Sequence, residues 1–452
     1  MRLNKELYDF QKIGIYKAVQ NKRFLLGLDM GLGKTFTALY YLKIIRDKLG
    51  EKLSTFIIVD ANKVKDWNAE AQQFNFKNFY MVKNSADFEK VDTKNGYIIV
   101  VSYPTFRNLV TNEKINLSLQ HNMIIDESQA LKNPKSKISK IMLKNNENFN
   151  RVLLLSGDPI SNGYENLFVQ LHLLKALEPH IKYIDFLDSF CNYATVLPKR
   201  GQTNVFRIIN SYKNIDYLME LLNAKSYFIS TKQVMKLPEQ VENYMEVETC
   251  EEYSTIRKQR VLIKDGYEMI ADNTINLLHY CRQLASGVIK DNDGNFHLLN
   301  TSKIDVLKNI IISTQQNITV FYNYKAELHF IKEMLKALEI AYFEINGECN
   351  NLDQALAYSG RSIILIQFQA GARGIDGLQN ISNLQVYFSP TLSGELFKQS
   401  IKRIHRIGQE KECSYIFLVS KSTIEKEIYK QLNKARDYTL KMFENTLEET
   451  WD

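Results

Sequence analysis

Met30-Gly31-Leu32-Gly33-Lys34-Thr35 is the clearest indication of the fold of this chain. The apolar run Phe24–Leu26 precedes it and helix-forming residues follow it, so the stretch predicts a loop between a strand and a helix. Such a loop presents backbone N–H groups and a helix N-terminus to phosphate oxygens. We therefore expect Lys34 to reach the β- and γ-phosphates of a nucleotide and the Thr35 hydroxyl to ligate a magnesium ion.

Two similar sets of apolar, β-branched runs lie along the chain. The runs are apolar throughout rather than alternating, which is typical of parallel strands buried on both faces. Helical patterns separate them, so we predict an α/β fold with two doubly wound parallel-sheet lobes. The runs of the first set are Thr55–Val59, Tyr97–Val101, Met123–Ile125 and Val152–Leu155, and those of the second are Ile318–Tyr322, Ile363–Ile366, Leu384–Phe388 and Ser414–Leu418.

The sequence between the two sets has a different character. Strand signals are sparse there and helix-compatible stretches rich in Tyr, Leu and Lys prevail, with Leu237-Pro238 as a break. We therefore expect a first, nucleotide-binding lobe with a helical protrusion over residues 1–232. A helical connection is expected over 233–300 and a second lobe over 301–452.

Composition and charge are those of an ordinary globular protein. Hydrophobic residues make up 45% of the 452 residues and charged residues 24%. No apolar run approaches the roughly 20 residues that span a bilayer, and no signal peptide is visible. The five cysteines lie far apart with no Cys-x-x-Cys pair, which argues against a disulfide framework or a zinc site and favours a reducing, cytoplasmic setting. The net charge of +7 would help a polyanion approach, but an ordinary basic enzyme fits it equally well.

Asp126 and Glu127 follow the Met123–Ile125 run, where the carboxyl edge of a parallel sheet faces a ligand crevice. Asp126 is expected to hold magnesium, and Glu127 to orient and deprotonate an attacking water. An Asp-Glu pair alone is more often a solvated turn. The upstream Lys34 favours the catalytic interpretation.

Gln399–Arg406 is helix-compatible and places Arg403 and Arg406 three residues apart on one face. Two guanidinium groups from a second lobe would neutralise charge that develops on a γ-phosphate, an effect worth roughly 10³ to 10⁵ in rate. A solvated basic helix is the commoner fate of such a run. Its position after a strand and the turn Gly371-Ala372-Arg373-Gly374 favours the catalytic role.

These motifs, in this order, resemble helicase superfamily two and, within it, the Swi/Snf-type double-stranded DNA translocases in a minimal form. The resemblance runs from Leu7 to about Tyr429, and Arg403–Gln409 is its most specific match. It implies two RecA-like lobes that bind ATP and Mg²⁺ between them, and a nucleic-acid-stimulated ATPase. The implied substrate is double-stranded DNA, in replication, recombination or repair, and targeting by a partner protein is compatible with the short chain.

The resemblance also assigns roles to individual residues. The nucleotide-binding residues are Gln11, as the amide that would read adenine, with Met30, Gly31, Leu32, Gly33, Lys34, Thr35, Gly374 and Asp376. The catalytic residues are Lys34, Asp126, Glu127, Arg403 and Arg406, with Thr35 and Asp126 on the metal. Gln129, Ser156, Gly157 and Gln399 would couple hydrolysis to movement, and Ser102, Tyr103, Lys132 and Asn133 would face nucleic acid, with Asn323 as a further candidate.

Departures from the family pattern leave alternatives open. Gln129 stands where the family has His, although an amide also donates and accepts hydrogen bonds. Gln367–Gln369 replaces Ser-Thr-Lys, and Ala372–Asp376 is closer to the RNA helicase version of its motif. The alternatives are a strand-separating DNA or RNA helicase and a hydrolysis-dead scaffold that binds nucleic acid, with single-stranded DNA or RNA as other possible partners. The short stretch between Asn346 and Arg361 leaves little room for a strand-separating wedge domain, which favours translocation.

Overall fold

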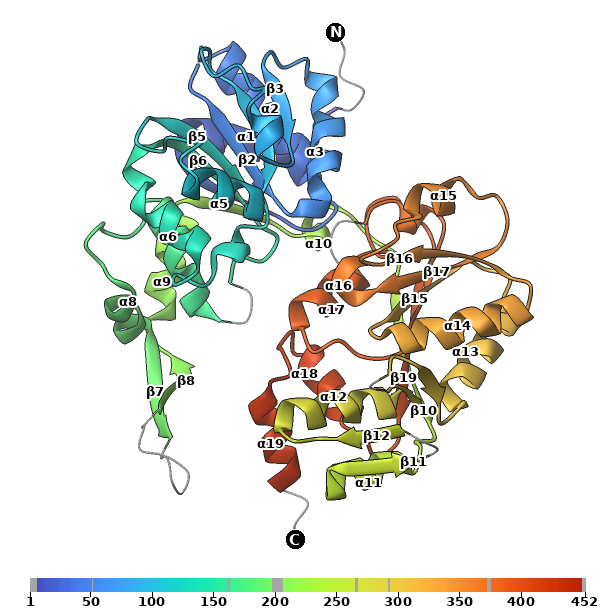
Figure 1. Ribbon diagram of the computed structural model, residues 1–452. Helices are drawn as coiled ribbons and strands as arrows, with labels where there is room; N and C mark the ends of the chain where they lie inside the picture. The colour runs from blue at the N-terminus through green and yellow to red at the C-terminus, as the bar shows by residue number, and fades with distance from the viewer. Residues whose placement is uncertain are drawn as a thin grey trace. The chain divides into compact units, whose positions relative to one another are not determined.

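The computed structural model describes residues 6–50, 52–160, 163–196, 206–264, 267–291, 293–371 and 375–448. The chain divides into two compact units, Met1–Met235 and Lys236–Asp452. Each unit contains one parallel sheet with helices packed against it (Figure 1). The predicted α/β class with two doubly wound parallel sheets is confirmed. Within the described ranges no helix combines the length and the apolar character that crossing a membrane requires.

A seven-stranded parallel sheet forms the centre of the first unit, in the order β3-β4-β2-β5-β6-β1-β9. Its inner strands are apolar on both faces and buried, because helices cover the sheet on each side. The strands are β1 (Arg23–Leu28), β2 (Thr55–Val59), β3 (Phe79–Val82), β4 (Ile98–Ser102), β5 (His121–Ile125), β6 (Phe149–Leu155) and β9 (Ser226–Ile229). The helices are α1 (Asp9–Gln20), α2 (Lys34–Asp47), α3 (Val64–Ala71), α4 (Ser85–Phe88), α5 (Tyr103–Thr111), α6 (Lys137–Lys144), α7 (Phe168–Leu173), α8 (Tyr183–Phe190), α9 (Ile215–Asn223) and α10 (Thr231–Val234).

The protrusion of the first unit contains a β-hairpin, not helices alone as expected. Strands β7 (Cys191–Val196) and β8 (Phe206–Tyr212) pair antiparallel and project beyond α8 and α9 (Figure 1). Thr and Ile residues in these strands favour extended backbone, and the pairing of the two segments outweighs the helical pattern around them.

A six-stranded parallel sheet forms the centre of the second unit, in the order β10-β19-β18-β15-β17-β16. Apolar side chains of the sheet and its helices make one core on each face. The strands are β10 (Gln240–Val247), β15 (Ile318–Tyr322), β16 (Ala341–Ile345), β17 (Ser362–Gln367), β18 (Leu384–Tyr387) and β19 (Cys413–Ser420). The helices are α11 (Glu252–Gln259), α12 (Thr274–Ala285), α13 (Ser302–Ser313), α14 (Lys325–Ala337), α15 (Leu352–Ala357), α16 (Phe368–Gly371), α17 (Gly394–Ile401), α18 (Glu425–Leu432) and α19 (Leu440–Glu448).

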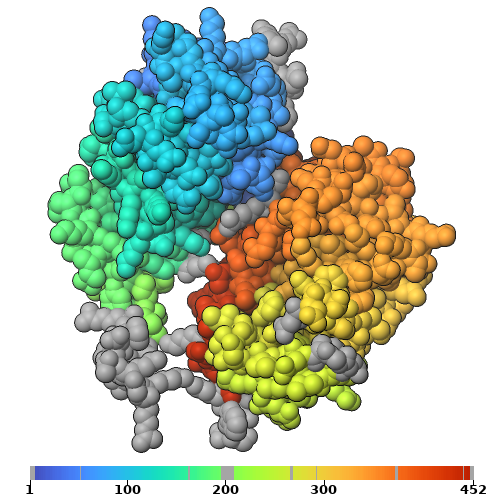
Figure 2. All heavy atoms as spheres, in the orientation of Figure 1, coloured from blue at the N-terminus to red at the C-terminus, as the bar shows by residue number. Residues whose placement is uncertain are grey.

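The segment over 233–300, expected as a helical connection, is different in the structure. It contributes β10 to the second sheet and forms two hairpins, β11 (Val261–Lys264) with β12 (Tyr267–Ile270) and β13 (Val288–Lys290) with β14 (Phe296–Leu298). Figure 2 shows the yellow-green part of this segment beside the red C-terminal end of the chain. Tyr253 and Leu277 share a buried cluster with Phe443, so the segment belongs to the core of the second unit.

Candidate nucleotide site

The phosphate loop lies between β1 and α2, at the carboxyl edge of the first sheet. Gly31 and Gly33 have φ angles of 84° and 75°, in the left-handed region that glycine adopts without strain. Lys34 is the first residue of α2. The N–H groups at the start of this helix have no intrahelical acceptor and are available to an anion in the loop.

Gln11 contacts the loop from α1. Its Nε2 donates to Leu32 O over 2.9 Å, and its Oε1 accepts from Tyr8 N over 3.0 Å. A Cβ atom at Gly33 would lie only 2.7 Å from Gln11 Nε2, so a larger residue would displace the amide. Gln11 therefore supports the loop, and its expected contact with adenine stays a prediction.

Lys34 lies beside the carboxylate pair that follows β5. Its Nζ is 4.0 Å from Glu127 Oε1 and donates to Leu28 O over 3.2 Å. A Cβ atom at Gly157 would lie 3.5 Å from the same Nζ, an ordinary contact distance, so Gly157 lies directly beside the ammonium group. Glu127 has a φ angle of 48°, which few residues with side chains adopt. The structure thus brings Lys34, Glu127 and Gly157 together, and their roles in catalysis and coupling stay predictions.

Asp126 is buried, with 7% of its surface exposed. One carboxylate oxygen accepts from Trp67 Nε1 over 3.0 Å and the other from Glu127 N over 3.1 Å. Burial, followed by the charge of Glu127, raises the pKa of Asp126 to about 6, and the nearby Lys34 opposes the rise. A cation bound nearby would stabilise the charged form of this buried carboxyl group. The Thr35 hydroxyl has no hydrogen-bond partner among the described residues, so Asp126 and Thr35 fit the expected magnesium ion.

A chain of hydrogen bonds links Glu127 to the segment after β6. Gln129 Nε2 donates to Glu127 Oε2 over 2.7 Å, and Ser156 Oγ donates to Gln129 Oε1 over 2.7 Å. Asp158 N in turn donates to Ser156 Oγ over 3.1 Å. The side chains of Gln129 and Ser156 are both buried. The amide bridges the two partners because it donates with one end and accepts with the other.

Ser102 and Tyr103, expected to face nucleic acid, bond within the first unit. Ser102 Oγ caps α5 by accepting from Thr105 N over 3.2 Å. Tyr103 OH donates to Asp126 O over 2.6 Å and supports the backbone of the carboxylate pair. Both side chains are buried, whereas Lys132 is half-buried and Asn133 exposed after β5. Contact of any of these residues with nucleic acid stays a prediction.

The two arginines of the second unit lie in turns, which corrects the expectation of a continuous helix over Gln399–Arg406. Helix α17 ends at Ile401. The Gln409 side chain donates to the carbonyl groups of three residues and holds the turns closed. One of these carbonyl groups is that of Ile404, over 3.2 Å, so the amide contacts the backbone between the two arginines.

Arg403 and Arg406 are both held by the segment that follows β17. Arg403 is 4% exposed and its NH1 donates to Ile375 O over 2.5 Å. Arg406 NH1 lies 3.2 Å from Asp376 Oδ1. Asp376 is therefore an ion-pair partner of the motif, and its contact with nucleotide stays a prediction. Gly374 lies outside the described residues. The amide of the predicted coupling residue Gln399 donates to Glu395 Oε1 within α17.

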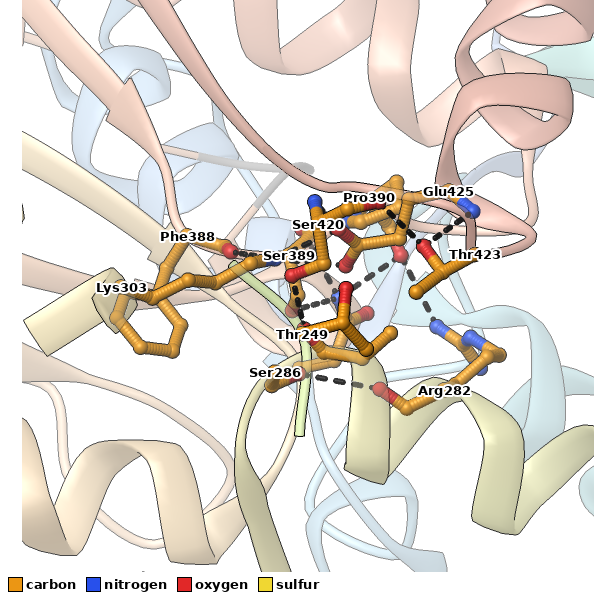
Figure 3. Close-up of polar contacts among 12 residues, drawn as sticks. Thr249, Arg282, Ser286, Lys303, Phe388, Ser389, Pro390, Ser420, Thr423 and Glu425 are labelled. Carbon is orange, nitrogen blue, oxygen red and sulfur yellow. Dashed lines mark hydrogen bonds and ion pairs between the residues drawn. The ribbon is translucent and has the colours of Figure 1, made fainter. Parts of the chain in front are cut away.

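Asn323 lies at the carboxyl edge of the second sheet, in a buried polar network. Its Nδ2 donates to Ser389 Oγ over 2.8 Å and to Pro390 O over 3.1 Å. Figure 3 shows Ser389 and Pro390 close to Lys303 and Glu425, which form a buried ion pair with Nζ 2.7 Å from Oε1. The amide of Asn323 thus holds the loop after β18, and its contact with nucleic acid stays a prediction.

Sequence reasoning missed several residues that build the site. Tyr103 OH and Trp67 Nε1 both bind Asp126, and Asp29 Oδ1 accepts from Met30 N at the start of the phosphate loop over 2.9 Å. Only Asp29 had a signal, its place directly before the loop. The other two contacts join residues far apart in the sequence.

A phosphate loop and a carboxylate pair at one sheet edge, with an arginine motif on a second parallel-sheet unit, are typical of the class of two-unit P-loop proteins. The SNF2-related domain matches residues 15–287, and the helicase conserved C-terminal domain matches residues 302–408. The first match covers more than half of the chain. The chain belongs to the SNF2-related family.

The relatives of the chain are larger proteins. An uncharacterized ATP-dependent helicase of Mycoplasma genitalium is 24% identical over 96% of this chain and 42% of its own length. The human DNA annealing helicase and endonuclease ZRANB3 is 22% identical over 97% of this chain and 40% of its own length. The chain thus spans about two fifths of the length of these relatives. The Sulfolobus solfataricus SWI2/SNF2 ATPase core in complex with dsDNA has 18% identity and a TM-score of 0.44, covering 99% of this chain and 94% of that one.

Proposed function

We propose that this chain is a nucleic-acid-stimulated ATP hydrolase that translocates along double-stranded DNA. The observation that carries the proposal is the Lys34 ammonium group 4.0 Å from Glu127, directly beside the buried Asp126. Membership of the SNF2-related family supports it. The names of the relatives, an ATP-dependent helicase and a DNA annealing helicase, support ATP as the nucleotide that is hydrolysed and DNA as the substrate.

In this proposal, different residues of the first unit bind the phosphates, activate the attacking water and hold the metal ion. The loop N–H groups and Lys34 bind the β- and γ-phosphates. Glu127 orients the attacking water and accepts its proton, while the Gln129 amide on Oε2 fixes the carboxylate. Asp126 and Thr35 hold Mg²⁺, which neutralises phosphate charge when bound.

Arg403 and Arg406 stabilise the γ-phosphate charge that develops during hydrolysis. Each is already held, Arg403 by Ile375 O and Arg406 by Asp376. Asp376 is 65% exposed in its side chain, so a phosphate group can replace this carboxylate at little cost. The predicted rate effect of the arginines is roughly 10³ to 10⁵.

Turnover assays with three nucleic acids test the proposal. Duplex DNA is expected to stimulate ATP hydrolysis more than single-stranded DNA or RNA does. Lys34→Ala and Glu127→Gln are expected to abolish turnover with the fold retained in circular dichroism. Lys43→Ala is the matched control, because this lysine of α2 forms an exposed ion pair with Asp47 and lies over the Phe76 ring, outside the site. Near-normal turnover in either site variant contradicts the site, and stimulation chiefly by RNA contradicts the substrate.

Movement along DNA is tested separately from hydrolysis. A translocase is expected to displace a third strand from a triplex without separating the duplex beneath it. Because such motors contact backbone phosphates, DNA binding is expected to weaken steeply with salt. A flat response to salt, or strand separation in place of triplex displacement, contradicts translocation on duplex DNA.

A further inference from the structure

The segment that joins the two units is anchored to the phosphate loop at its first end. Thr231 N and Thr231 Oγ1 both donate to Asp29 Oδ2, over 3.4 and 3.2 Å. The other oxygen of the same carboxylate accepts from Met30 N over 2.9 Å. A single side chain therefore binds the start of the phosphate loop and the start of the joining segment.

Sheet topology explains this anchor. Strand β9 pairs in parallel with β1 at the edge of the first sheet, with Ile229 opposite Leu28. Asp29 N continues this ladder by donating to Ile229 O over 3.0 Å. Because parallel strands end at the same edge, the phosphate loop and the joining segment leave the sheet side by side.

The other end of the segment is anchored to the arginine motif. His405 Nε2 lies 2.8 Å from Pro238 O, a distance at which the imidazole N–H donates to the carbonyl. His405 stands between Arg403 and Arg406 in the sequence. Beyond Pro238 the chain enters β10, which pairs in parallel with β19 over its whole length. The segment therefore meets the motif directly before it becomes part of the second sheet.

We propose that Thr231–Pro238 is a coupling strap that ties the phosphate loop to the arginine motif, with Asp29, Thr231 and His405 as positioning residues. The inference rests on the proposed ATP hydrolysis and deepens it. Eight residues span at most about 3.3–3.6 Å each, so the strap limits how far the motif can move from the loop. A short tether also keeps the arginines at a high effective concentration at the nucleotide.

Lengthening the strap tests the proposal, with both anchors left intact. Eight Gly/Ser residues inserted between Met235 and Lys236 double its length, and sixteen triple it. Since effective concentration falls roughly as the −3/2 power of tether length, DNA-stimulated kcat is expected to fall about threefold and about fivefold. Binding of a fluorescent ATP analogue is expected to stay unchanged, because the loop itself is not altered. The control carries the same insertions in the Asp293-Gly294 turn between β13 and β14.

Substitutions at the anchors give a second test. Thr231→Val keeps the shape of the side chain and removes its hydrogen bond to Asp29. His405→Leu removes the bond to Pro238 O, whereas His405→Gln retains an N–H donor. We expect Thr231→Val and His405→Leu to lower stimulated kcat with KM for ATP unchanged, and His405→Gln to restore it. If His405 contributed only to stability, the two His405 variants would not differ in stimulated kcat at an unchanged KM for ATP.

The outcomes separate the strap from the proposed function. Stimulated turnover that does not respond to strap length overturns the strap, and so does an equal loss in the control insertions. Loss of nucleotide binding in the strap insertions also overturns it. Turnover that persists in Lys34→Ala overturns the proposed ATP site itself, whatever the strap variants do.

Discussion

At the scale of single residues, the candidate site depends on a carboxyl group whose charged form is disfavoured by burial. Asp126 is buried beside Glu127, and this raises its pKa to about 6 from an ordinary value of 3.8. Two hydrogen-bond donors, Trp67 Nε1 and Glu127 N, hold it in place. A bound cation would stabilise the charged form of this carboxylate, and we propose that Asp126 holds such a cation.

The raised pKa of Asp126 predicts how the stability of the first unit depends on pH. The native protein binds this proton more tightly than the unfolded chain does. The contribution of Asp126 to the free energy of unfolding is therefore largest below pH 3.8 and is lost as pH rises through about 6. Asp126→Asn does not titrate. Its free energy of unfolding, relative to the wild type, is expected to rise by on the order of 1–3 kcal/mol between pH 4 and pH 7, measured by urea denaturation.

Trp67 offers a suitable probe for this measurement, because it is buried in the first unit and contacts Asp126 directly. Glu70→Gln on the same helix is a control that removes a carboxyl group from a half-buried position outside the site. An Asp126→Asn variant whose stability parallels the wild type across this pH range would show that Asp126 is ionised normally.

Gln129 carries a prediction about the orientation of the general base. Gln129→Leu removes the donor to Glu127 Oε2 and leaves Ser156 Oγ without its acceptor. Without this donor the Glu127 carboxylate is no longer oriented toward the attacking water and accepts its proton less efficiently. We therefore expect kcat to fall roughly 10- to 100-fold. Gln129→His, with one ring nitrogen to donate and one to accept, is expected to retain most of the activity. Steady-state ATP turnover with duplex DNA measures both, and equal activity of the two variants contradicts the role.

Sequence alone could place Lys34 and the Asp126-Glu127 pair at one sheet edge, because each follows its own strand directly. It could not predict what supports them. Tyr103 and Trp67 bind Asp126 from α5 and α3, and only the packing of these helices on the sheet brings the residues together. The structure thus adds the residues that hold the site.

At the scale of elements, the strands that could be predicted from the sequence are those buried inside the two parallel sheets. Every apolar run that the sequence analysis identified forms a strand of one of the two parallel sheets. Within the two parallel sheets, the strands missed by sequence are β3 and β9 at the edges of the first sheet, and β10 and β16 at the edges of the second. Strand β10 is largely exposed and polar residues interrupt it, so it lacks a continuous apolar run, whereas β3 is apolar but only four residues long. The absence of an apolar run in β10 explains why this part of the segment over 233–300 gave no strand signal.

The ion pair between Lys303 and Glu425 predicts how elements of the second unit are joined. Lys303 Nζ contacts both oxygens of Glu425 and Phe388 O, and both side chains are almost fully buried. Removing one partner leaves a buried charge without compensation. Lys303→Met is expected to lower the free energy of unfolding by about 3–5 kcal/mol, measured by chemical denaturation with circular dichroism.

The double variant Lys303→Met/Glu425→Gln is expected to recover much of this loss, since no unpaired charge remains and the amide oxygen can still accept from Ser420 N. Lys325→Met is the matched control, because its ion pair with Glu348 is exposed and contributes little to stability. A similar loss in Lys325→Met, or a double variant less stable than either single one, contradicts the structural role of the buried pair.

At the scale of the whole molecule, the chemistry is divided between two compact units. The phosphate loop and the carboxylates belong to Met1–Met235, and the arginine motif belongs to Lys236–Asp452. Each unit has its own sheet and its own buried cores. The proposed activity therefore needs the covalent connection, whereas folding and the first contact with nucleotide do not.

This division predicts the behaviour of the separated units. Residues 1–235 expressed alone are expected to fold and to bind a fluorescent ATP analogue, because every group on the loop side of the site lies within this unit. ATP turnover is expected to fall by roughly 10³-fold or more without Arg403 and Arg406. Adding residues 236–452 in trans at micromolar concentration is expected to restore little, since a short tether supplies an effective concentration of about millimolar. Full turnover by the isolated first unit would remove the arginines from the mechanism, and full rescue in trans at micromolar concentration would show that the connection is dispensable.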